Sequence, residues 1–584
     1  MKGQHNEWNI MKKCLLLILG IYCTVATSTA QQKVIDITPS SEADNRNIEI
    51  ALEKAASYKG KPVTIRLSTG IYDLSRSEAI KKSYYVSNTT SESENPDPTK
   101  HIGILLKQLK NVTIDGCGST LLATGLITNF VLDQCENITF KNLSIDSSDP
   151  AQTEMEILEN GNDYLIAKVH STSHYQVENG KIRWKGDGWA FEKGIAQSYD
   201  REKDITWRSW SPMSGLTNTV ELRPGMLYLQ YKQKPNITPH TVFQMRDGIR
   251  NEVCGLVNAS KNIRFENVNF FYLGNFGVVC QSTENVTFKQ TNFSPKPGSG
   301  RTNAGYADFI QVSGCKGKVQ IMNSKFSGAH DDPINVHGTH LKVVDFISPK
   351  QIKVRYMHPQ TYGFSAFLEG DEIELVNTNS LLCIEKAKVV KAQLINPREM
   401  ILTLNHALHP TTTSDKDIVV ENITWTPEVE IINNDFSRIP TRGILVSTRR
   451  KILIEGNTFY GMQMSGILVA NDALSWYESG PVYDLTIRRN TFIDCGNPVI
   501  LIHPENKVFN GIIHKNITIE ENVFDFKTNK DNAIEAKATK SLIIRRNLFK
   551  IKEDSKYDSS DLIKTKDCEN VIIEGNTIYK DIKY

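Results

Sequence analysis

One short repeated segment constrains the fold of this chain more than any other feature of its sequence. Each copy is a β-rich run followed by an asparagine and then an aromatic or aliphatic residue, as in Lys451–Phe459 (KILIEGNTF) and Lys515–Phe524 (KNITIEENVF). The asparagines of the later copies lie 23 to 33 residues apart, at Asn434, Asn457, Asn490, Asn522, Asn547 and Asn576. Short strands at such a period are typical of a solenoid, in which each coil packs on the one before it.

A second strand follows each run. Its eight aligned copies include Ala307–Val312 (ADFIQV), Asp331–Val336 (DDPINV) and Arg442–Val446 (RGILV). We therefore predict an all-β chain, folded as a right-handed parallel β-helix with two inserted small antiparallel β-barrel-like modules. The asparagines are expected to form a ladder along the solenoid, because each side-chain amide can bond to the neighbouring coil. A sandwich of unrelated strands is the alternative, but it does not explain the aligned copies.

Departures from the repeat divide the chain into units. Ile48–Ala56 has the apolar spacing of a helix, and with the strand region Val63–Leu74 it is expected to cap the first coil. Two stretches alternate apolar and polar residues without the coil repeat, which is typical of antiparallel strands. The predicted units are a signal peptide (1–30), a cap with the first coils (31–150), an inserted β module (151–250), central coils with the aspartate cluster (251–340), an inserted β-barrel module (341–425) and C-terminal coils (426–584).

The first thirty residues have the layout of an export signal. Lys12 and Lys13 precede an apolar run from Cys14 to Val25, and small residues follow as far as Ala30. We expect cleavage after Ala30 and export to the periplasm, the cell surface or the medium. A membrane anchor and a lipoprotein anchor are the alternatives, although the apolar run is short for a bilayer. No later segment is long and apolar enough to cross a membrane, so no membrane span is predicted.

The charge balance argues against one class of partner. Lys and Arg together number 68 and Asp and Glu number 66, which gives a formal net charge of +2. A surface that binds phosphates normally shows as a basic excess, so nucleic acid is not expected as a partner.

Three aspartates are the strongest candidates for catalysis. Asp308 and Asp332 stand in the same column of successive coils, 24 residues apart, and Asp331 precedes Asp332. Adjacent coils lie about 4.8 Å apart, so the three carboxylates are expected to converge. Crowded like charges raise the pKa of at least one carboxyl group, which leaves a protonated acid beside an ionised base. Inverting glycosidases use such a pair, with room for a water molecule.

The neighbours of this cluster are predicted to bind substrate. They are His330, Asn335, His337 and Arg442. Arg442 is expected in the column of Asp331 on the next coil, where it could orient a carboxylate or bond a sugar hydroxyl. Each of the four also has a purely structural alternative. Three carboxylates could instead hold Ca²⁺, but no metal and no cofactor are predicted. The basic pair Arg449-Arg450 is interpreted as a solvated turn.

The cap, the coil repeat and the spacing of Asp308 from Asp331-Asp332 resemble the pectin-lyase-like β-helix superfamily. The aspartates are similar to those of the polygalacturonases of glycoside hydrolase family 28. However, His330 stands where that family has glycine, and no Arg-Ile-Lys motif follows to bind a substrate carboxylate. A polygalacturonase-like hydrolase is therefore kept as an alternative.

A closer resemblance is to glycoside hydrolase family 110, the bacterial exo-acting α-1,3-galactosidases. Tyr84–Thr89 (YYVSNT), His330–Gly338 (HDDPINVHG) and the inserted modules carry it. The resemblance implies an enzyme that releases terminal α-1,3-linked galactose, including that of the blood group B determinant, with inversion and without metal. It also implies that Asp331 is the general acid and that Asp308 and Asp332 activate the water. Dependence on a branching fucose, and acceptance of linear αGal1-3Gal, stay open.

Two further classes of protein stay open. A polysaccharide lyase would need a Lys or Arg base and usually Ca²⁺. A non-catalytic glycan-binding solenoid or adhesin would bind glycan without releasing a product, whereas three carboxylates on adjacent coils favour catalysis. The expected partner is an oligosaccharide with a terminal α-galactose, and formation of a homodimer stays open.

Overall fold

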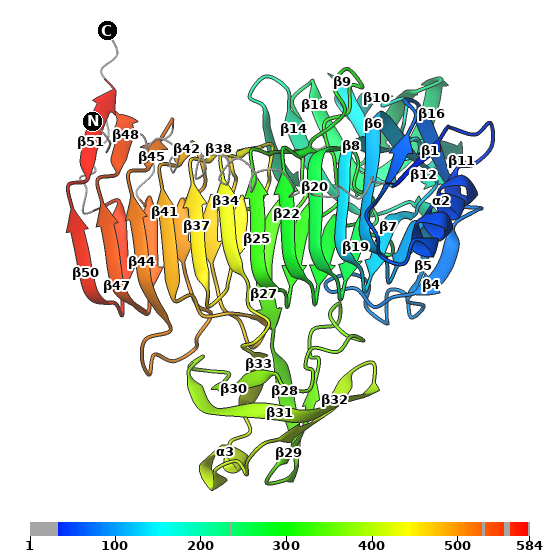
Figure 1. Ribbon diagram of the computed structural model, residues 1–584. Helices are drawn as coiled ribbons and strands as arrows, with labels where there is room; N and C mark the ends of the chain where they lie inside the picture. The colour runs from blue at the N-terminus through cyan, green and yellow to red at the C-terminus, as the bar shows by residue number, and fades with distance from the viewer. Residues whose placement is uncertain (1–32, 234–235, 528–531, 554–560, 582–584) are drawn as a thin grey trace, which may run out of the picture.

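The computed structural model describes residues 33–233, 236–527, 532–553 and 561–581. The predicted signal peptide, 1–30, lies outside the described residues. Most strands pair in parallel from coil to coil in two long sheets, of 22 and 13 strands. Figure 1 shows the coils stacked in one direction from the N-terminal cap to the last coil. The prediction of a parallel β-helix is confirmed.

The coils that carry the predicted site show the repeating unit of three strands. One coil consists of β25 (Lys316–Met322), β26 (Lys325–Ser327) and β27 (Ile334–Thr339). The next consists of β34 (Glu428–Ile432), β35 (Asp435–Ser437) and β36 (Ile444–Val446), each paired in parallel with its counterpart. Alternate side chains of β25 and β34 are buried, so consecutive coils share one continuous core.

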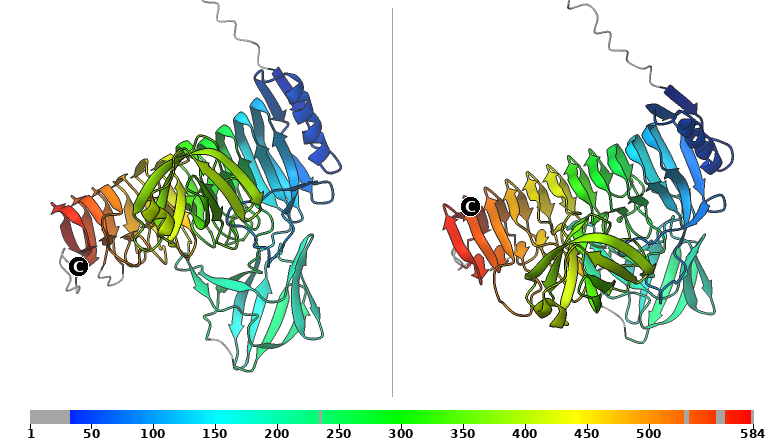
Figure 2. Two further views of the ribbon diagram at one scale, coloured as in Figure 1. Left: turned by 90° about the horizontal axis from the view of Figure 1, so that it is seen from below. Right: turned by 60° about the horizontal axis from the view of Figure 1, so that its bottom comes forward.

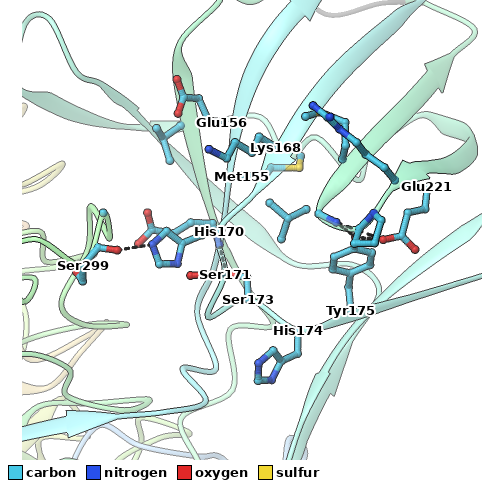
Figure 3. Close-up of a pocket in the computed structure, with 18 of the residues that line it drawn as sticks. Met155, Glu156, Lys168, His170, Ser171, Ser173, His174, Tyr175, Glu221 and Ser299 are labelled. Atoms are coloured by element: carbon cyan, nitrogen blue, oxygen red, sulfur yellow. Dashed lines mark hydrogen bonds between the residues drawn. The ribbon is translucent and has the colours of Figure 1, made fainter.

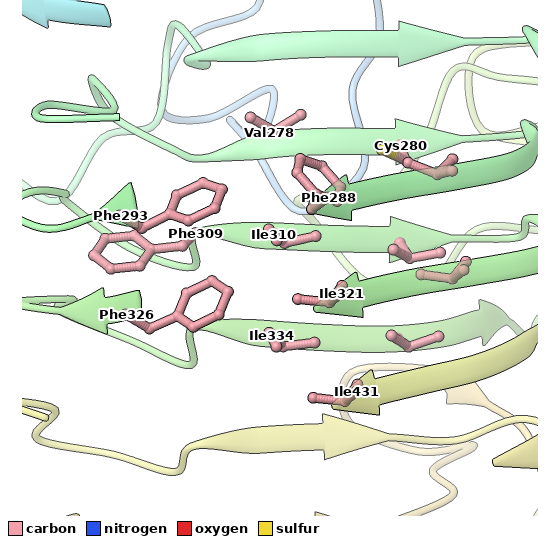
Figure 4. Packing of buried hydrophobic residues seen from close by; sticks show 14 of the residues in the cluster. Val278, Cys280, Phe288, Phe293, Phe309, Ile310, Ile321, Phe326, Ile334 and Ile431 are labelled. Carbon is pink, nitrogen blue, oxygen red and sulfur yellow. The ribbon is translucent and has the colours of Figure 1, made fainter. Parts of the chain in front are cut away.

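An asparagine ladder and a stack of phenylalanines run along this core. Asn490 Nδ2 donates to Asn522 Oδ1 (3.0 Å), and Asn490 Oδ1 accepts from Asn457 Nδ2 (2.9 Å). The predicted ladder is therefore confirmed. The rings of Phe436 and Phe459 lie nearly parallel with centroids 4.6 Å apart. The same stack includes Phe293, Phe326, Phe492, Phe524 and Phe549, and Figure 4 shows its N-terminal part.

The N-terminal end of the solenoid is covered, as predicted. The helix α2 (Asn45–Ser57) buries Ile48 and Leu52 in the main core, and it lies across the first coil in Figure 1. The strand β1 (Lys33–Ile37) pairs in parallel with β2 (Val63–Leu67). The helix thus covers the open end of the core and keeps its apolar side chains away from water.

The first insert consists of two antiparallel sheets. Seven strands pair in the order β15-β14-β18-β9-β10-β17-β16, and β11, β12 and β13 form a separate small sheet. The strands are β9 (Thr153–Asn160), β10 (Tyr164–Val169), β11 (Tyr175–Glu178), β12 (Lys181–Gly186), β13 (Trp189–Phe191), β14 (Ile195–Asp200), β15 (Ile205–Ser209), β16 (Leu216–Arg223), β17 (Met226–Tyr231) and β18 (Thr241–Arg246). Within the described residues no pairing joins the end strands, so this insert is an open sheet rather than the expected barrel-like form. Figure 2 shows it beside the solenoid.

The second insert is a closed antiparallel barrel of six strands, as predicted. They are β28 (Leu341–Ser348), β29 (Gln351–Arg355), β30 (Glu372–Asn377), β31 (Cys383–Asn396), β32 (Glu399–Leu404) and β33 (Ile418–Asn422). The barrel encloses its own apolar core, which includes Ile352, Leu375 and Leu402. It begins directly after β27, so the barrel lies beside the coil that carries Asp331 and Asp332.

Arg449 joins this barrel to the solenoid. Its guanidinium contacts Glu374 of β30 at 2.6 Å and Glu421 of β33 at 3.2 Å, and all three side chains are at least nine-tenths buried. The interpretation of Arg449-Arg450 as a solvated turn is therefore wrong for Arg449. The reason is that the barrel supplies two buried carboxylates that the local sequence around Arg449 does not reveal.

No helix in the described parts of the chain has the length and apolar character needed to cross a membrane.

Candidate active site

Asp308, Asp332 and Arg442 stand in one column of three successive coils. Ile310 of β24 (Ile310–Ser313) pairs with Ile334, and Ile334 pairs with Ile444. Asp308, Asp332 and Arg442 each stand two residues before these isoleucines. The prediction that placed Arg442 in the column of Asp331 is therefore wrong by one position, because the strand before Ile444 was aligned on Asp331 rather than on Asp332.

Arg442 binds Asp332 with both arms of its guanidinium. Nη2 lies 2.8 Å from Oδ2 and Nε lies 3.0 Å from Oδ1. The backbone N–H of Arg442 also donates to Oδ1, at 3.2 Å. Burial raises the pKa of Asp332, whereas the charge of Arg442 opposes that rise. Such a paired fork fixes the plane of the carboxylate as well as its charge.

Asp308 is a buried carboxyl group with a raised pKa. Its side chain is buried, and Asn335 Nδ2 lies 3.4 Å from its Oδ2. Burial is the main cause that raises the pKa of Asp308 well above its usual range, and the charges of Asp331 and Asp332 raise it further. Asn335 Oδ1 has no hydrogen-bond partner within the described structure.

Asp331 lies between two arginines that the sequence did not single out. Arg208 Nη2 is 3.5 Å from Oδ1, and Arg250 Nη2 is 3.6 Å from Oδ2. The guanidinium of Arg250 also lies over the ring of Phe276, 5.0 Å from its centroid. Arg208 belongs to β15 and Arg250 follows β18, so both come from the first insert or its end. Neither has a place in the coil repeat, and repeat alignment could not have found them.

The ring of His330 is buried among side chains of the first insert. It is 1% exposed, and both ring nitrogens have protein neighbours. Arg246 Nε donates to Nδ1 at 3.2 Å, and Nε2 lies 2.8 Å from Gln244 Oε1. Gln197 Nε2 also donates to the carbonyl oxygen of His330, at 2.8 Å. Burial, together with the charge of Arg246, lowers the pKa of His330 well below its usual value, so a neutral ring anchors the first insert beside Asp331.

His337 is likewise buried and bonded to protein. Its Nδ1 donates to the carbonyl of Gly338 (2.7 Å), and its Nε2 lies 3.2 Å from Gln311 Nε2 and 3.5 Å from Glu478 Oε1. The structure thus brings Asp308, Asp331, Asp332, Asn335 and Arg442 together at one surface. The rings of His330 and His337 are buried and bonded to neighbouring protein groups.

Asn88, in the segment YYVSNT, forms hydrogen bonds to three separate parts of the chain near the site. Its Nδ2 donates to Glu478 Oε1 at 2.8 Å, and its carbonyl accepts from Arg250 Nη1 at 3.0 Å. Thr361 Oγ1, from the second insert, donates to Asn88 Oδ1 at 2.5 Å. Asn88 has a φ of +57°, a conformation that asparagine tolerates better than most residues. One short segment therefore connects the early coils, both inserts and β40 (Glu478–Ser479).

A large hollow of about 1020 Å³ lies elsewhere, on the first insert. Figure 3 shows its lining, which includes Glu156, Lys168, His170 and Tyr175. None of the three aspartates lines it. In the described parts of the chain, no three His, Cys, Asp or Glu side chains are grouped so that they could hold a metal ion. The carboxylate cluster instead has arginines as its positive neighbours.

Comparison with known proteins places the chain in a family. Residues 351–419 match the family description "GLAA-B beta-barrel domain II", and residues 417–581 match "Right handed beta helix region". An "Alpha-1,3-galactosidase A" of Bacteroides thetaiotaomicron is 60% identical over 549 residues, which is 94% of this chain and 97% of that protein. A protein of the same name from Bacteroides fragilis is 36% identical over 98% of this chain and 96% of its own length.

A second type of relative is also similar along most of the chain. An "Alpha-1,3-galactosidase B" of Bacteroides thetaiotaomicron is 30% identical over 88% of this chain and 85% of its own length. The matches to both types cover the coils and the inserts together. The chain therefore belongs to the bacterial α-1,3-galactosidases, glycoside hydrolase family 110, within the pectin-lyase-like β-helix superfamily.

Proposed function

We propose that this chain is an exo-acting glycosidase that releases terminal α-1,3-linked galactose from an oligosaccharide. The observation that carries the proposal is the aspartate cluster, held on adjacent coils beside Arg442 in a chain whose relatives are named α-1,3-galactosidases. Buried carboxyl groups with different neighbours divide into an acid and a base, which is what glycoside hydrolysis requires.

The proposed reaction inverts the configuration at the anomeric carbon. Asp331 donates its proton to the glycosidic oxygen as that bond breaks. Asp308 and Asp332 take a proton from a water molecule, which attacks the opposite face of the sugar ring. Two features support these roles: Asp331 is the most exposed of the three carboxylates, with 19% side-chain exposure, and Arg442 orients Asp332.

One observation favours a second assignment, in which Asp308 is the acid. Burial, together with the charges of Asp331 and Asp332, raises the pKa of Asp308, which favours its protonated form. Asp331 has two guanidinium groups beside it.

Variants distinguish the two assignments. An acid variant keeps much of its activity on a galactoside with a good leaving group, such as a dinitrophenyl α-galactoside, because that group departs without protonation. A base variant loses activity on every leaving group but recovers some with azide, which attacks without being deprotonated. We expect Asp331→Asn to behave as the acid variant and Asp308→Asn as the base variant. The reverse result would establish the second assignment.

The first test is galactose release from the fucosylated blood group B trisaccharide and from linear αGal1-3Gal. We expect the wild type to release galactose from at least one of them, and Asp331→Asn to lose activity by about 100-fold or more. Activity on the trisaccharide alone would show that the fucose branch is needed. Absence of galactose from both substrates would contradict the proposed activity. Proton NMR identifies which anomer of galactose is released first, and this tests inversion. We expect β-galactose.

Export is part of the proposal, on the basis of the residues before Ala30. A processed chain that begins after Ala30, found outside the cytoplasm, is the expected result. Formation of a homodimer is a separate question that the sedimentation rate of the purified protein answers.

A further inference from the structure

An aromatic pair, in which Trp476 is exposed and His358 half-buried, has no part in the mechanism above. The rings of Trp476 and His358 stack with centroids 4.4 Å apart and planes at 26°. Trp476 follows β39 (Ile467–Val469) on the solenoid, whereas His358 lies between β29 and β30 of the second insert. Trp476 is 45% exposed, which is unusual for a large aromatic side chain held in such a stack.

The loop that carries Trp476 is held rigidly. The carboxylate of Asp472 accepts hydrogen bonds from the backbone N–H groups of Leu474 (2.8 Å), Trp476 and Tyr477 (3.0 Å). His340, at the start of the second insert, donates from its backbone N–H to Tyr477 O and from Nδ1 to Asp472 O, both at 2.8 Å. These bonds involve the backbone of Trp476, so its indole has one face on His358 and its exposed area open to a ligand.

A short chain of contacts connects this loop to Asp331. Glu478 follows Trp476 by two residues, and its Oε1 accepts from Asn88 Nδ2 at 2.8 Å. The carbonyl of Asn88 accepts from Arg250, which lies 3.6 Å from Asp331. Trp476 and Asp331 are thus joined by a short series of neighbouring residues.

His358 also lies close to this series of residues. Burial lowers the pKa of His358, with an opposing effect from Glu478 and a further lowering by Arg250. The imidazole is thus a neutral aromatic face close to both residues, and its stacking does not depend on charge.

Exposure increases from the aspartates to the aromatic pair. The residues of Asp308, Asp332 and Asn335 are 6%, 2% and 5% exposed, against 45% for Trp476. An exo-acting enzyme encloses the terminal sugar and leaves the rest of the glycan towards solvent. The terminal galactose therefore occupies the buried end, and the sugar to which it is linked extends towards the aromatic pair.

We propose that Trp476 and His358 form a platform for the sugar ring that carries the galactose. This inference rests on the proposed galactosidase function and adds the site of the second sugar. A pyranose has an apolar face of C–H groups, which packs on the flat face of an aromatic ring, while its hydroxyls stay in water. With this platform the enzyme binds the second sugar of the glycan as well as the terminal galactose.

Two substrates test the platform. One is the blood group B trisaccharide, and the other is methyl α-galactoside, which has no second ring. We expect Trp476→Ala to lower kcat/KM on the trisaccharide by about tenfold, mostly through KM, because one stacking contact is lost. It should leave kcat/KM on methyl α-galactoside and inhibition by free galactose unchanged. Trp476→Phe, which keeps an aromatic face, should recover most of the loss.

A control variant and a binding measurement complete the test. Tyr579→Ala removes an aromatic side chain that is 53% exposed on the last coil and should change neither substrate. Equal losses on both substrates, or no loss on the trisaccharide, would overturn the platform. Trisaccharide binding to Asp331→Asn, measured by calorimetry with and without Trp476→Ala, needs no turnover. If the wild type releases no galactose, the proposed activity fails, and this binding difference still decides whether the platform holds a glycan.

Discussion

The guanidinium of Arg442 holds both carboxylate oxygens of Asp332 across the gap between two coils, at 2.8 and 3.0 Å. The second insert separates these two residues by 110 positions in the sequence. Once the barrel is left out, they occupy the same place in consecutive coils. The solenoid thus fixes the carboxylate of Asp332 with the same coil-to-coil pairing that builds its core.

Arg442→Met is expected to reduce activity at neutral pH by about 100-fold, because Asp332 loses the guanidinium that orients its carboxylate and favours its charged form. Burial already raises the pKa of Asp332, and without the opposing charge of Arg442 that pKa rises further. A base works only when ionised, so the acidic limb of the pH–rate profile should move to higher pH. Arg489→Met, which removes an exposed surface ion pair with Glu521, is the matched control and should leave the profile unchanged.

The asparagine ladder gives a stability prediction that is independent of the site. Asn490 donates to Asn522 Oδ1 and Ile454 O, both at 3.0 Å, and its Oδ1 accepts from the N–H and Nδ2 of Asn457, both at 2.9 Å. Asn490→Ala should lower the free energy of unfolding by about 2–4 kcal/mol, because buried groups are left unpaired. Asn292→Ala removes a half-buried amide and should cost about 1 kcal/mol or less. Urea unfolding compares the two, and equal costs would count against the ladder.

The structural features that recur once in each coil could be predicted from the sequence. The strands, the ladder and the convergence of Asp308 with Asp332 all depend on residues one coil apart, and the repeat makes such residues visible. The cap was visible for a related reason, because the buried Ile48 and Leu52 follow helical spacing.

The residues that surround the aspartates could not be predicted in the same way. Arg208, Arg250 and Glu478 come from the first insert, its end and the short strand β40, none of which repeats. Their positions depend on how the inserts fold back on the coils. The sequence shows that His330 precedes Asp331. It does not show that the ring of His330 is buried and bonded to Arg246 and Gln244 of the first insert.

The contact of Arg449 with the barrel predicts how the free energy of unfolding depends on pH. Acid is expected to weaken the wild type at this contact and to relieve part of the cost of an Arg449 variant. Although burial raises the pKa of Glu374, Arg449 makes the net shift a lowering. Glu374 therefore contributes stability above the usual glutamate pKa, and the wild type loses it as pH falls through the lowered value. Arg449→Met removes the guanidinium from the buried Glu374 and Glu421 and leaves Glu374 with the exposed Lys386, which should cost about 3–5 kcal/mol at neutral pH.

Acid should partly relieve this variant, because protonation removes the unpaired charges. The difference in free energy of unfolding between the wild type and Arg449→Met is thus expected to shrink between pH 7.5 and pH 5. Lys386→Met, which removes the exposed partner of Glu374 at 3.1 Å, is the control and should have a small effect. A difference that stays constant with pH would mean that the carboxylates are not charged in the native protein.

His514 gives a pH dependence of stability that lies far from the site. Its Nδ1 accepts from the backbone N–H of Val482 at 3.0 Å, and burial lowers the pKa of His514 to about 3. Between pH about 6.5 and about 3 the unfolded chain binds a proton that the native ring does not. Stability is therefore complete above about pH 6.5 and is lost on acidification, by about 1.4 kcal/mol per pH unit.

His514→Asn, whose Oδ1 can accept the same bond, removes this pH dependence. Urea unfolding from pH 7 to pH 4 should therefore show that the free energy of unfolding falls less in the variant than in the wild type. A difference between His514→Asn and the wild type that does not vary with pH would show that the native ring takes up the proton.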